Sequence, residues 1–511
     1  MMNTSYPSGA RTVSRLLSYR ADHEPDAVFS SFLHDNDSDD LSYAQAWEMA
    51  QSGARLLANA GVGAGATFAV MTDNCREFFA CWFGAALLGA VIVPISPRSS
   101  VDEIAFIIGH AQCRLLICGQ ERGAELPADL GVPVITCGAD FEAHSQGSSP
   151  PNATVGPEWP LAVMYTSGTT GRPKGVVVTH ANYVEAGTVV ANHLRMRPDD
   201  RWMVCLPLFH ANAQYYCVMS ALVTGASVAV APRFSATRWP AQIRRSAATL
   251  ASLFAAPMRM ILAQQGPDTP TSLRATIFAQ NLTPGQLEEF QHRFDTALVQ
   301  IYGMTETIAP VLMNPLHDRR DNMTVGLPVR TGAVRVLTAD GRDAEIGEIG
   351  ELLVAGSPGS TLMAGYLHDE TATAEAFLDG WLRTGDLVTI DEHGYFSIVD
   401  RKKNMIKRAG ENVAAAEVER VVNLHPGVFE CAVVGEPDPV RDERIRAFVV
   451  LEPGHGDVTG EDTIAYCTRH LADFKVPSVV DIVGSLPHTA VGKVQKHRLG
   501  AASSGVRKAA P

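Results

Sequence analysis

A run rich in glycine and hydroxyl side chains, Tyr165-Thr-Ser-Gly-Thr-Thr-Gly-Arg-Pro-Lys174, carries the clearest chemical pattern in the sequence. Six of its ten residues are Thr, Ser or Gly, and a lysine closes the run. Such a loop offers backbone N–H groups and hydroxyls to phosphate oxygens, and its glycines permit close approach. The apolar residues 161–165 before it predict a strand, and Thr179 after it is typical of a capped helix start. We therefore interpret the run as a phosphate-binding loop between a strand and a helix.

This loop differs from that of the P-loop NTPases. Their motif places Gly-Lys-Ser/Thr at the start of the helix, so that lysine and hydroxyl meet the terminal phosphates and magnesium. Here Lys174 follows Pro173 and precedes Gly175. The lysine must therefore approach phosphate in a different arrangement.

Length and composition predict a globular protein of two or more domains, because 511 residues exceed what one core usually holds. The 42 basic and 55 acidic residues give a net charge of −13, which disfavours general nucleic-acid binding. The nine cysteines are scattered and none forms Cys-x-x-Cys, so neither a cysteine-ligated metal site nor a disulfide framework follows from their spacing. We accordingly predict a reducing, cytoplasmic location.

One uncharged run, residues 78–93, could suggest a membrane segment. A membrane helix needs about 20 such residues, and Gly84, Gly89 and Pro94 interrupt this one. A buried helix over 76–88 followed by a strand over 91–95 is the better interpretation. The N-terminal arginines lack an apolar core between them, so we expect no signal peptide.

Helices and short apolar strands alternate through most of the chain. Before residue 140 we expect helices over 43–60, 76–88 and 101–110, and strands over 67–71, 91–95 and 114–118. After residue 180 the expected strands are 202–206, 227–231, 250–254, 276–278 and 298–301. This alternation predicts layered, parallel, doubly wound sheets. From 325 to 354 closely spaced strands with glycine turns indicate a small β-barrel-like subdomain.

The character of the sequence changes near residue 400. Residues 400–408 hold five cations in an otherwise acidic protein. Beyond them we expect helices over 414–423 and 463–472 and strands over 432–434 and 447–451. The predicted fold class is therefore α/β: a large N-terminal domain (1–399) of layered, mostly parallel sheets flanked by helices, and a smaller α+β C-terminal domain (400–511).

Five further stretches follow the phosphate-binding loop in order. They are Leu206-Pro-Leu-Phe-His210, Gln300-Ile-Tyr-Gly-Met-Thr-Glu-Thr307, Arg383-Thr-Gly-Asp386, Asp400-Arg-Lys-Lys-Asn-Met-Ile-Lys407 and Leu486-Pro-His-Thr-Ala-Val-Gly-Lys-Val-Gln-Lys496. Together with the loop they resemble the adenylate-forming enzymes, the family of acyl-CoA synthetases, adenylation domains and luciferases, over essentially residues 40 to 500. The resemblance implies that ATP activates a carboxylate as an acyl-adenylate with release of pyrophosphate, after which a thiol displaces AMP.

The resemblance also implies residue roles. The ATP phosphates are expected at Thr166, Ser167, Gly168, Thr169, Thr170 and Lys174. Mg²⁺ is expected at Thr166 and Glu306, the α-phosphate at Thr305, adenine near Tyr302, the ribose hydroxyls at Asp386, and ribose or phosphate at Arg401. Lys493 would reach the α-phosphate and the carboxylate during adenylation. The expected catalytic set is Lys493, Glu306, Thr305 and His210.

The C-terminal domain is expected to rotate about a hinge at 400–403, with Lys403 at the hinge position. Coenzyme A is the expected co-substrate, and its phosphates could meet Lys402, Arg408, Gly410 and Arg441. A separate carrier protein is the alternative acceptor, because both thiols sit on the same pantetheine arm. A degenerate regulator is disfavoured, since Lys493, Glu306 and Asp386 are all present. A homodimer is a further expectation.

The acyl pocket is expected to include His210, Asn212, Gln214, Gln280, Asn281, Gly303 and Met304. Amino-acid-activating relatives place an aspartate where His210 stands, and residues 209–214 offer no acid. Because a buried ammonium without a counter-charge is costly, an α-amino acid is disfavoured. The segment is most similar to acyl-CoA ligases near carnitine-CoA ligase. Gln280 and Asn281 depart from the family's glycine-rich turn, so adenine contact or the acyl pocket is altered there.

Overall fold

The computed structural model describes residues 11–35, 37–127, 129–148, 153–166, 173–264, 271–330, 333–408, 411–438, 442–488 and 494–499. The chain divides into two compact units. Unit 1 comprises Met1–Gln280, Gln286–Val334 and Val354–Arg383, and unit 2 comprises Asn281–Gly285, Arg335–Leu353 and Thr384–Pro511.

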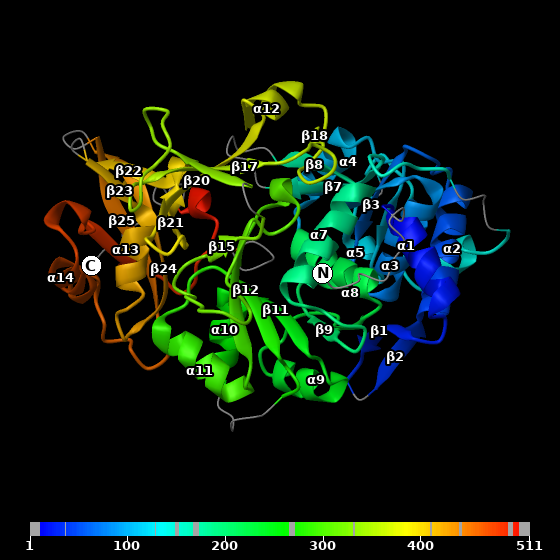
Figure 1. Ribbon diagram of the computed structural model, residues 1–511, viewed down its shortest axis with the longest axis horizontal. Helices are drawn as coiled ribbons and strands as arrows, with labels where there is room; N and C mark the ends of the chain where they lie inside the picture. Colours follow the sequence, from blue (N-terminus) through cyan, green and yellow to red (C-terminus); the bar gives the residue numbers. More distant parts are fainter. Residues whose placement is uncertain are drawn as a thin grey trace. The chain divides into compact units, whose positions relative to one another are not determined.

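A seven-stranded sheet in unit 1 contains the two strands that flank the loop expected to bind phosphate (Figure 1). Its order is β18 (Gly365–Tyr366), β8 (Lys174–Thr179), β7 (Pro160–Thr166), β4 (Val91–Pro94), β3 (Thr67–Met71), β5 (Leu116–Cys118) and β6 (Val134–Thr136). The strands from β7 to β6 are parallel, whereas β8 and β18 are antiparallel additions at one edge. The chain passes from β3 to β4 on one side and then to β5 on the other, so the sheet is doubly wound about β3.

A second, nine-stranded sheet also belongs to unit 1. Its order is β15 (Leu327–Pro328), β14 (Leu312–Met313), β13 (Ala297–Tyr302), β12 (Ala275–Ala279), β11 (Leu250–Phe254), β9 (Arg201–Val204), β10 (Ser227–Val230), β1 (Val28–Leu33) and β2 (Ser38–Ser42). The strands from β1 to β13 are parallel, and the edge strands β2, β14 and β15 pair antiparallel. The two layered, mostly parallel sheets predicted from the sequence are confirmed.

The uncharged run forms a helix inside the core, as predicted. Helix α3 (Arg76–Leu88) buries every residue from Phe78 to Leu88. Its Phe79 packs against Phe32 of β1, with the ring centroids 5.4 Å apart. No helix among the described residues is long and apolar enough to cross a membrane. The absence of charge in this run therefore follows from burial between protein layers.

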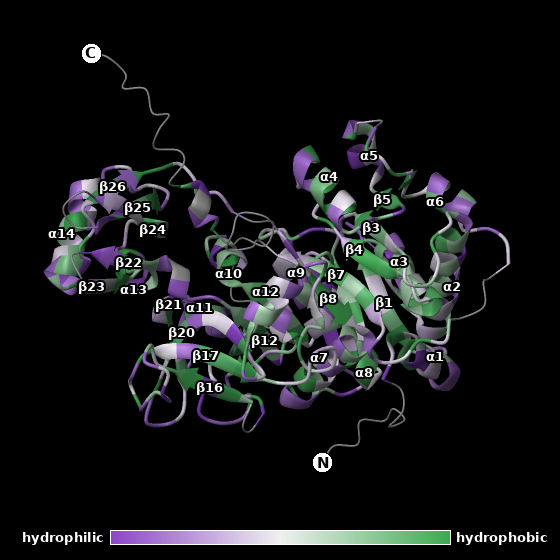
Figure 2. Ribbon diagram, turned by 90° about the horizontal axis from the view of Figure 1, so that it is seen from above, coloured by the Kyte–Doolittle hydropathy of each residue, from purple (hydrophilic) through white to green (hydrophobic). Residues whose placement is uncertain are grey.

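A glycine allows α3 to touch its neighbour α2 (Tyr43–Asn59). A Cβ atom at Gly53 would lie 1.8 Å from the carbonyl oxygen of Ala80, which no side chain could tolerate. Figure 2 shows the strands of the seven-stranded sheet as largely hydrophobic, while α5 (Gln120–Glu125) at its margin is polar. The core of unit 1 thus lies along these sheets and the helices packed on them.

Three of the remaining helices of unit 1 begin at capping boxes. Ser42, Ser100 and Thr179 each close a capping box at the start of α2, α4 (Val101–His110) and α7 (His180–His193). The others are α1 (Val13–His23), α6 (Ala139–His144), α8 (Met219–Thr224), α9 (Trp239–Ser246), α10 (Ala255–Leu262), α11 (Pro284–Phe294) and α12 (Glu370–Glu375).

A five-stranded sheet takes two of its strands from the region expected to be barrel-like, 325–354, and the other three from residues 377–401. Its order is β16 (Val334–Leu337), β17 (Gly350–Ala355), β20 (Trp381–Ile390) and β19 (Phe377–Leu378), and β21 (Phe396–Arg401) pairs with β20.

Unit 2 contains an α+β fold with its own core. Strands β23 (Glu411–Ala414), β22 (Met405–Arg408), β25 (Asp442–Leu451) and β24 (Val428–Asp438) lie side by side, and β26 (Val479–Ile482) pairs with β25. Helices α13 (Ala415–Val422) and α14 (Gly460–His470) complete it. Val418, Val433 and Val449 are among its fully buried residues. The predicted α+β character is confirmed, although β24 and β25 are longer than the two short strands expected.

Candidate active site

The two described ends of the phosphate-binding loop face each other across an antiparallel pair of strands. Thr166 ends β7, Lys174 begins β8, and the two are register partners. The predicted helix start at Thr179 is confirmed, but the sequence analysis did not predict strand β8, which lies between the loop and that helix. The β-branched run Val176-Val-Val-Thr179 favours this strand. Ser167, Gly168, Thr169 and Thr170 lie outside the described residues.

Lys174 is linked to Glu306 through a tyrosine. Its Nζ lies 4.8 Å from the ring centroid of Tyr366, a cation–π distance. The Tyr366 hydroxyl donates a hydrogen bond of 3.0 Å to Glu306 Oε1. Tyr366 reaches this position because β18 pairs with β8, which places it opposite Val176. The phosphate-binding loop and the Thr305-Glu306 motif are thereby brought together.

Glu306 occupies a buried turn at the carboxyl end of β13. It lies in the short 3₁₀ turn Thr305–Thr307 and is 7% exposed. Its carbonyl oxygen accepts a hydrogen bond from Met363 N at 3.0 Å. Thr307 Oγ1 accepts from Met304 N at 3.0 Å, which closes the turn. Tyr302 ends β13, so the residues predicted to meet adenine, the α-phosphate and magnesium follow one another at this strand end.

Tyr366 is a site residue that the sequence analysis missed. A two-residue strand has too few positions to show an alternating pattern, and the hydroxyl's partner lies far away in the sequence. The Gly365-Tyr366 pair therefore gave no local signal.

The predicted acyl pocket centres on His210 and a π-helical segment. His210 Nε2 is buried and has no hydrogen-bond partner among the described residues. Burial lowers the pKa of His210 to about 4, so the imidazole is neutral near pH 7. The following segment, Asn212–Val218, is a π-helix and is entirely buried. Such segments occur often at functional sites, and the sequence gave no sign of this one.

Gly303 packs closely against that π-helix. A Cβ atom at Gly303 would lie 2.9 Å from the hydroxyl oxygen of Tyr216 and 3.2 Å from Pro310 Cα. Any larger residue would displace the tyrosine or the backbone. The structure thus brings Gly303 and the segment after His210 to one place.

The polar side chains expected to line the pocket have partners within the protein. Gln214 accepts a hydrogen bond from the Tyr183 hydroxyl at 2.5 Å and donates one to the Leu208 carbonyl at 2.5 Å. Asn212 Oδ1 accepts from Ser252 Oγ at 2.8 Å. These contacts hold the π-helix in place, whatever further contact the amides make with an acyl group.

Gln280 stands where the family's turn is expected to be rich in glycine, yet its backbone has a conformation typical of glycine. Gln280 has a φ of +76°, in the left-handed region that glycine adopts most easily. The turn is therefore preserved at the cost of some strain. Asn281, the next residue, is exposed.

Two predicted ribose-binding residues are neighbours in unit 2. Asp386 on β20 and Arg401 on β21 are register partners, and Arg401 Nε lies 2.9 Å from Asp386 Oδ1. Asp386 is 4% exposed. A buried carboxylate held by an arginine is pre-oriented to accept hydrogen bonds from hydroxyls.

The expected hinge is anchored by Asp400. This buried residue accepts hydrogen bonds from Arg401 N at 2.6 Å and from Ala416 N, at the start of α13, at 2.8 Å. Lys403 lies in the intervening 3₁₀ turn Lys402–Asn404. Asp400 thus ties this turn to the first helix of unit 2.

Of the residues expected to meet coenzyme A, Lys402 and Arg408 are described. Lys402 Nζ lies 3.4 Å from Glu351 Oε2, and Arg408 donates to the carbonyl oxygens of Phe474 and Val476. Gly410 and Arg441 lie outside the described residues.

Lys493 also lies outside the described residues, but its loop is closed by described ones. His488 and Val494 form an antiparallel bridge, and Gln495 N donates to the Pro487 carbonyl at 2.7 Å. His488 Nε2 is 3.0 Å from Glu430 Oε2 on β24.

Comparison with known proteins shows the family of this chain. Residues 17–367 match the family model of the AMP-binding enzymes, and residues 417–493 match that of the AMP-binding enzyme C-terminal domain. The crotonobetaine/carnitine–CoA ligase of Salmonella typhimurium is 34% identical over 485 residues, which cover 90% of this chain and 93% of the relative.

Solved structures show the same architecture. ATP-bound MatB from Rhodopseudomonas palustris has a TM-score of 0.87 at 26% identity, covering 96% of this chain and 99% of its own. The o-succinylbenzoate CoA synthetase MenE from Bacillus subtilis, in complex with the acyl-adenylate intermediate OSB-AMP, has a TM-score of 0.84 at 26% identity, covering 97% and 99%. The fold and site define an AMP-forming acid–thiol ligase. The chain belongs to the AMP-binding enzyme family.

Proposed function

We propose that this enzyme joins a carboxylic acid to coenzyme A at the expense of ATP. ATP converts the carboxylate to an acyl-adenylate with release of pyrophosphate, and the CoA thiol then displaces AMP. The Salmonella typhimurium relative described above is named as a CoA ligase, which favours CoA over a separate carrier protein as the acceptor.

The observation that supports this proposal best is the chain of contacts from Lys174 through Tyr366 to Glu306. These contacts connect Lys174, at one end of the loop that we expect to bind phosphate, with the buried carboxylate of Glu306. Lys174, with Ser167, Gly168, Thr169 and Thr170, would hold the phosphates. Glu306 and Thr166 supply hard oxygen ligands suited to Mg²⁺, which would neutralise charge on the departing pyrophosphate.

The remaining roles concern ribose and the reacting carboxylate. Asp386 would accept hydrogen bonds from the ribose hydroxyls, and Arg401 would hold its orientation and contact the nucleotide. Thr305 would bind the α-phosphate, and Tyr302 would lie against adenine. Lys493 would stabilise the negative charge that develops between carboxylate and α-phosphate.

The two half-reactions need different environments around the same adenylate. We propose a domain division at 399/400. The C-terminal domain would rotate about Lys403 after adenylation, so that the Lys493 loop leaves the site and another surface of the domain admits the CoA thiol. Lys402, Arg408, Gly410 and Arg441 would then be available to the phosphates of CoA. A reducing cytoplasmic location and a homodimer stay predictions.

The acyl group would enter a neutral pocket at His210, Gly303 and Met304. A neutral imidazole cannot balance an ammonium group, and residues 209–214 contain no acid. We therefore propose a carboxylic acid without an α-ammonium group as substrate, with Asn212, Gln214, Gln280 and Asn281 shaping the surrounding wall.

Pyrophosphate release across a panel of carboxylic acids, with and without CoA, tests the proposal. We expect at least one non-amino acid to release pyrophosphate, and mass spectrometry to detect its CoA thioester only when CoA is present. A proteinogenic amino acid as the best substrate would contradict the argument from His210. Pyrophosphate release with no thioester from CoA would instead point to a carrier protein.

A further inference from the structure

Three potential metal ligands from distant parts of the sequence meet in unit 1. They are the sulfur atoms of Cys75 and Cys137 and a carboxylate oxygen of Glu77, which all lie within 4.8 Å of one another. All three side chains are partly buried, and both cysteines are free thiols. The scattered spacing of the cysteines gave no sign of a metal site, and only folding brings these two together.

Regular structure fixes each of these residues. Cys75 is the extended residue that precedes α3, with φ −149° and ψ 171°, and Glu77 lies in the first turn of that helix. Cys137 follows β6, and its N–H donates to the carbonyl oxygen of Cys118 at the end of β5 at 2.8 Å. Gly138, with a φ of +89°, turns the chain away immediately afterwards. The start of α3 and the ends of β5 and β6 therefore position the residues of the cluster.

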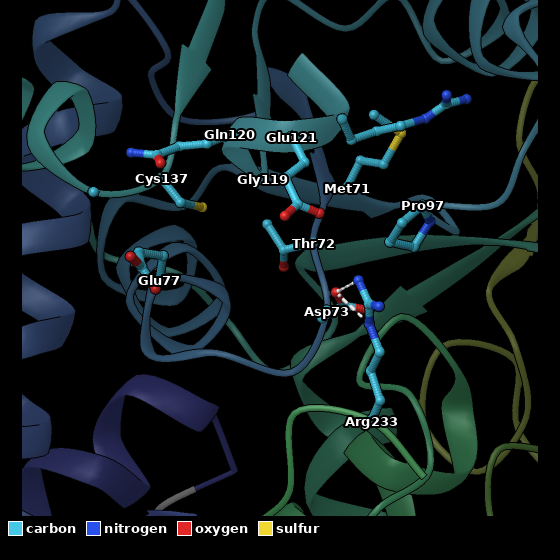
Figure 3. A pocket seen from close by; sticks show the side chains of 12 residues that line it. Met71, Thr72, Asp73, Glu77, Pro97, Gly119, Gln120, Glu121, Cys137 and Arg233 are labelled. Atoms are coloured by element: carbon cyan, nitrogen blue, oxygen red, sulfur yellow. Dashed lines mark hydrogen bonds and ion pairs between the residues drawn. The ribbon is translucent and has the colours of Figure 1, made fainter. Parts of the chain in front are cut away.

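A cavity of about 520 Å³ adjoins the cluster and includes Glu77 and Cys137 in its wall. It lies at the carboxyl ends of β3, β5 and β6, around the point where the strand order of the sheet reverses. Open parallel sheets typically bind their ligands at such a point. Figure 3 shows Glu77 and Cys137 at one side of this cavity and Pro97 and Arg233 at the other.

The wall of the cavity contains a polar group without a protein partner. Thr72 is only 4% exposed, and its buried Oγ1 makes no hydrogen bond to any described residue. A buried hydroxyl in this state is costly unless a ligand or water meets it. This observation is independent of the cysteines, and it gives the wall of the cavity a polar group that a ligand or water could meet.

We propose that Cys75, Cys137 and Glu77 bind one thiophilic divalent cation of the zinc type, with a fourth coordination position open to the cavity. Two thiolates and a carboxylate are a normal donor set for zinc, and three protein ligands leave one position for water or a small ligand. Tetrahedral geometry with Zn–S bonds of about 2.3 Å requires sulfur atoms about 3.8 Å apart. The observed separation, within 4.8 Å, needs only a small side-chain adjustment.

The cluster offers three donor atoms suited to one divalent cation. Such a cation would balance the charge of the Glu77 carboxylate, and its binding would release the two thiol protons to solvent.

Titration of the reduced, metal-free full-length protein with Co²⁺ tests the site directly. We expect one equivalent to bind with the thiolate-to-cobalt charge-transfer absorption in the near ultraviolet, and one equivalent of Zn²⁺ to displace it. Cys75→Ser and Cys137→Ser should each weaken binding by at least about 100-fold, more than the 10- to 100-fold typical of outer-shell partners. Glu77→Gln should weaken it less and retain the absorption.

Two controls keep the test independent of folding. Cys467→Ala changes a buried cysteine of unit 2 and should leave cobalt binding unchanged. In the wild type, one equivalent of Zn²⁺ should protect Cys75 and Cys137, and no other cysteine, from alkylation mapped by peptide mass spectrometry. Absence of the charge-transfer band, its persistence in both cysteine variants, or alkylation unaffected by Zn²⁺ would overturn the proposal. So would isolation of the protein with Cys75 and Cys137 already joined in a disulfide that persists with Zn²⁺ present.

Discussion

Replacement of Tyr366 by phenylalanine tests how the structure positions Glu306. The substitution removes one hydroxyl, and with it the 3.0 Å hydrogen bond to Glu306 Oε1. It keeps the aromatic ring that faces Lys174 Nζ at 4.8 Å. The change therefore isolates the hydrogen bond from the cation–π contact.

The size of the effect follows from the environment of the carboxylate. A hydrogen bond to a charged group contributes about 1.5–3 kcal/mol, which corresponds to about 10- to 150-fold in rate if it is all expressed in the transition state. Glu306 is buried, but Tyr366 itself is only half-buried, so water can replace part of the lost bond. We accordingly expect adenylation to slow by about tenfold, with a rise in the Mg²⁺ concentration needed for half-maximal rate.

Single-turnover release of pyrophosphate, measured across a magnesium titration, provides the assay. Tyr43→Phe is the matched control, because it removes a buried tyrosine hydroxyl that donates to the Ala226 carbonyl rather than to Glu306. It should lower thermal stability without changing the magnesium dependence. If Tyr366→Phe showed an unchanged magnesium titration and an unchanged rate, Tyr366 would have no role in orienting Glu306.

Three further predictions address catalysis, stability and motion. Lys493→Ala should abolish acyl-adenylate formation but largely spare thioester formation from synthetic acyl-adenylate, and equal loss of both half-reactions would refute the assigned role. Burial lowers the pKa of His180 to about 4, so below pH 6.5 the unfolded chain binds a proton that the folded chain does not. The free energy of unfolding should therefore fall by about 2 kcal/mol more in the wild type than in His180→Asn between about pH 7 and pH 5, as measured by urea denaturation, and parallel profiles would contradict this. Lys403→Pro should spare adenylation and strongly impair thioester formation, since proline restricts the expected hinge; unimpaired thioester formation would place the hinge elsewhere.

The sequence by itself determined the elements whose signals are local. The helices after Ser42, Ser100 and Thr179 begin where predicted because each capping box satisfies its own helix start. Strand β3 and helix α3 have the predicted bounds because a continuous apolar stretch between polar turns has few other ways to fold. The motifs identified the family because their residue types and order are set by the chemistry of ATP and carboxylate.

Only the tertiary structure decided which distant residues meet. Tyr366 reaches Glu306 because β18 pairs with β8. A strand of two residues is too short to be predicted from its sequence pattern. The left-handed backbone of Gln280 likewise depends on surrounding structure, because a glutamine has no intrinsic preference for it.

The cysteines show most clearly that a sequence pattern does not reveal which distant residues meet in the fold. Their spacing suggested no metal site, yet Cys75 and Cys137 lie together because α3 begins beside the end of β6. Local sequence patterns reflect the hydrogen bonds and the burial of each helix or strand by itself. Contacts between segments are set by how the sheets and helices pack, and that information is spread over the whole chain.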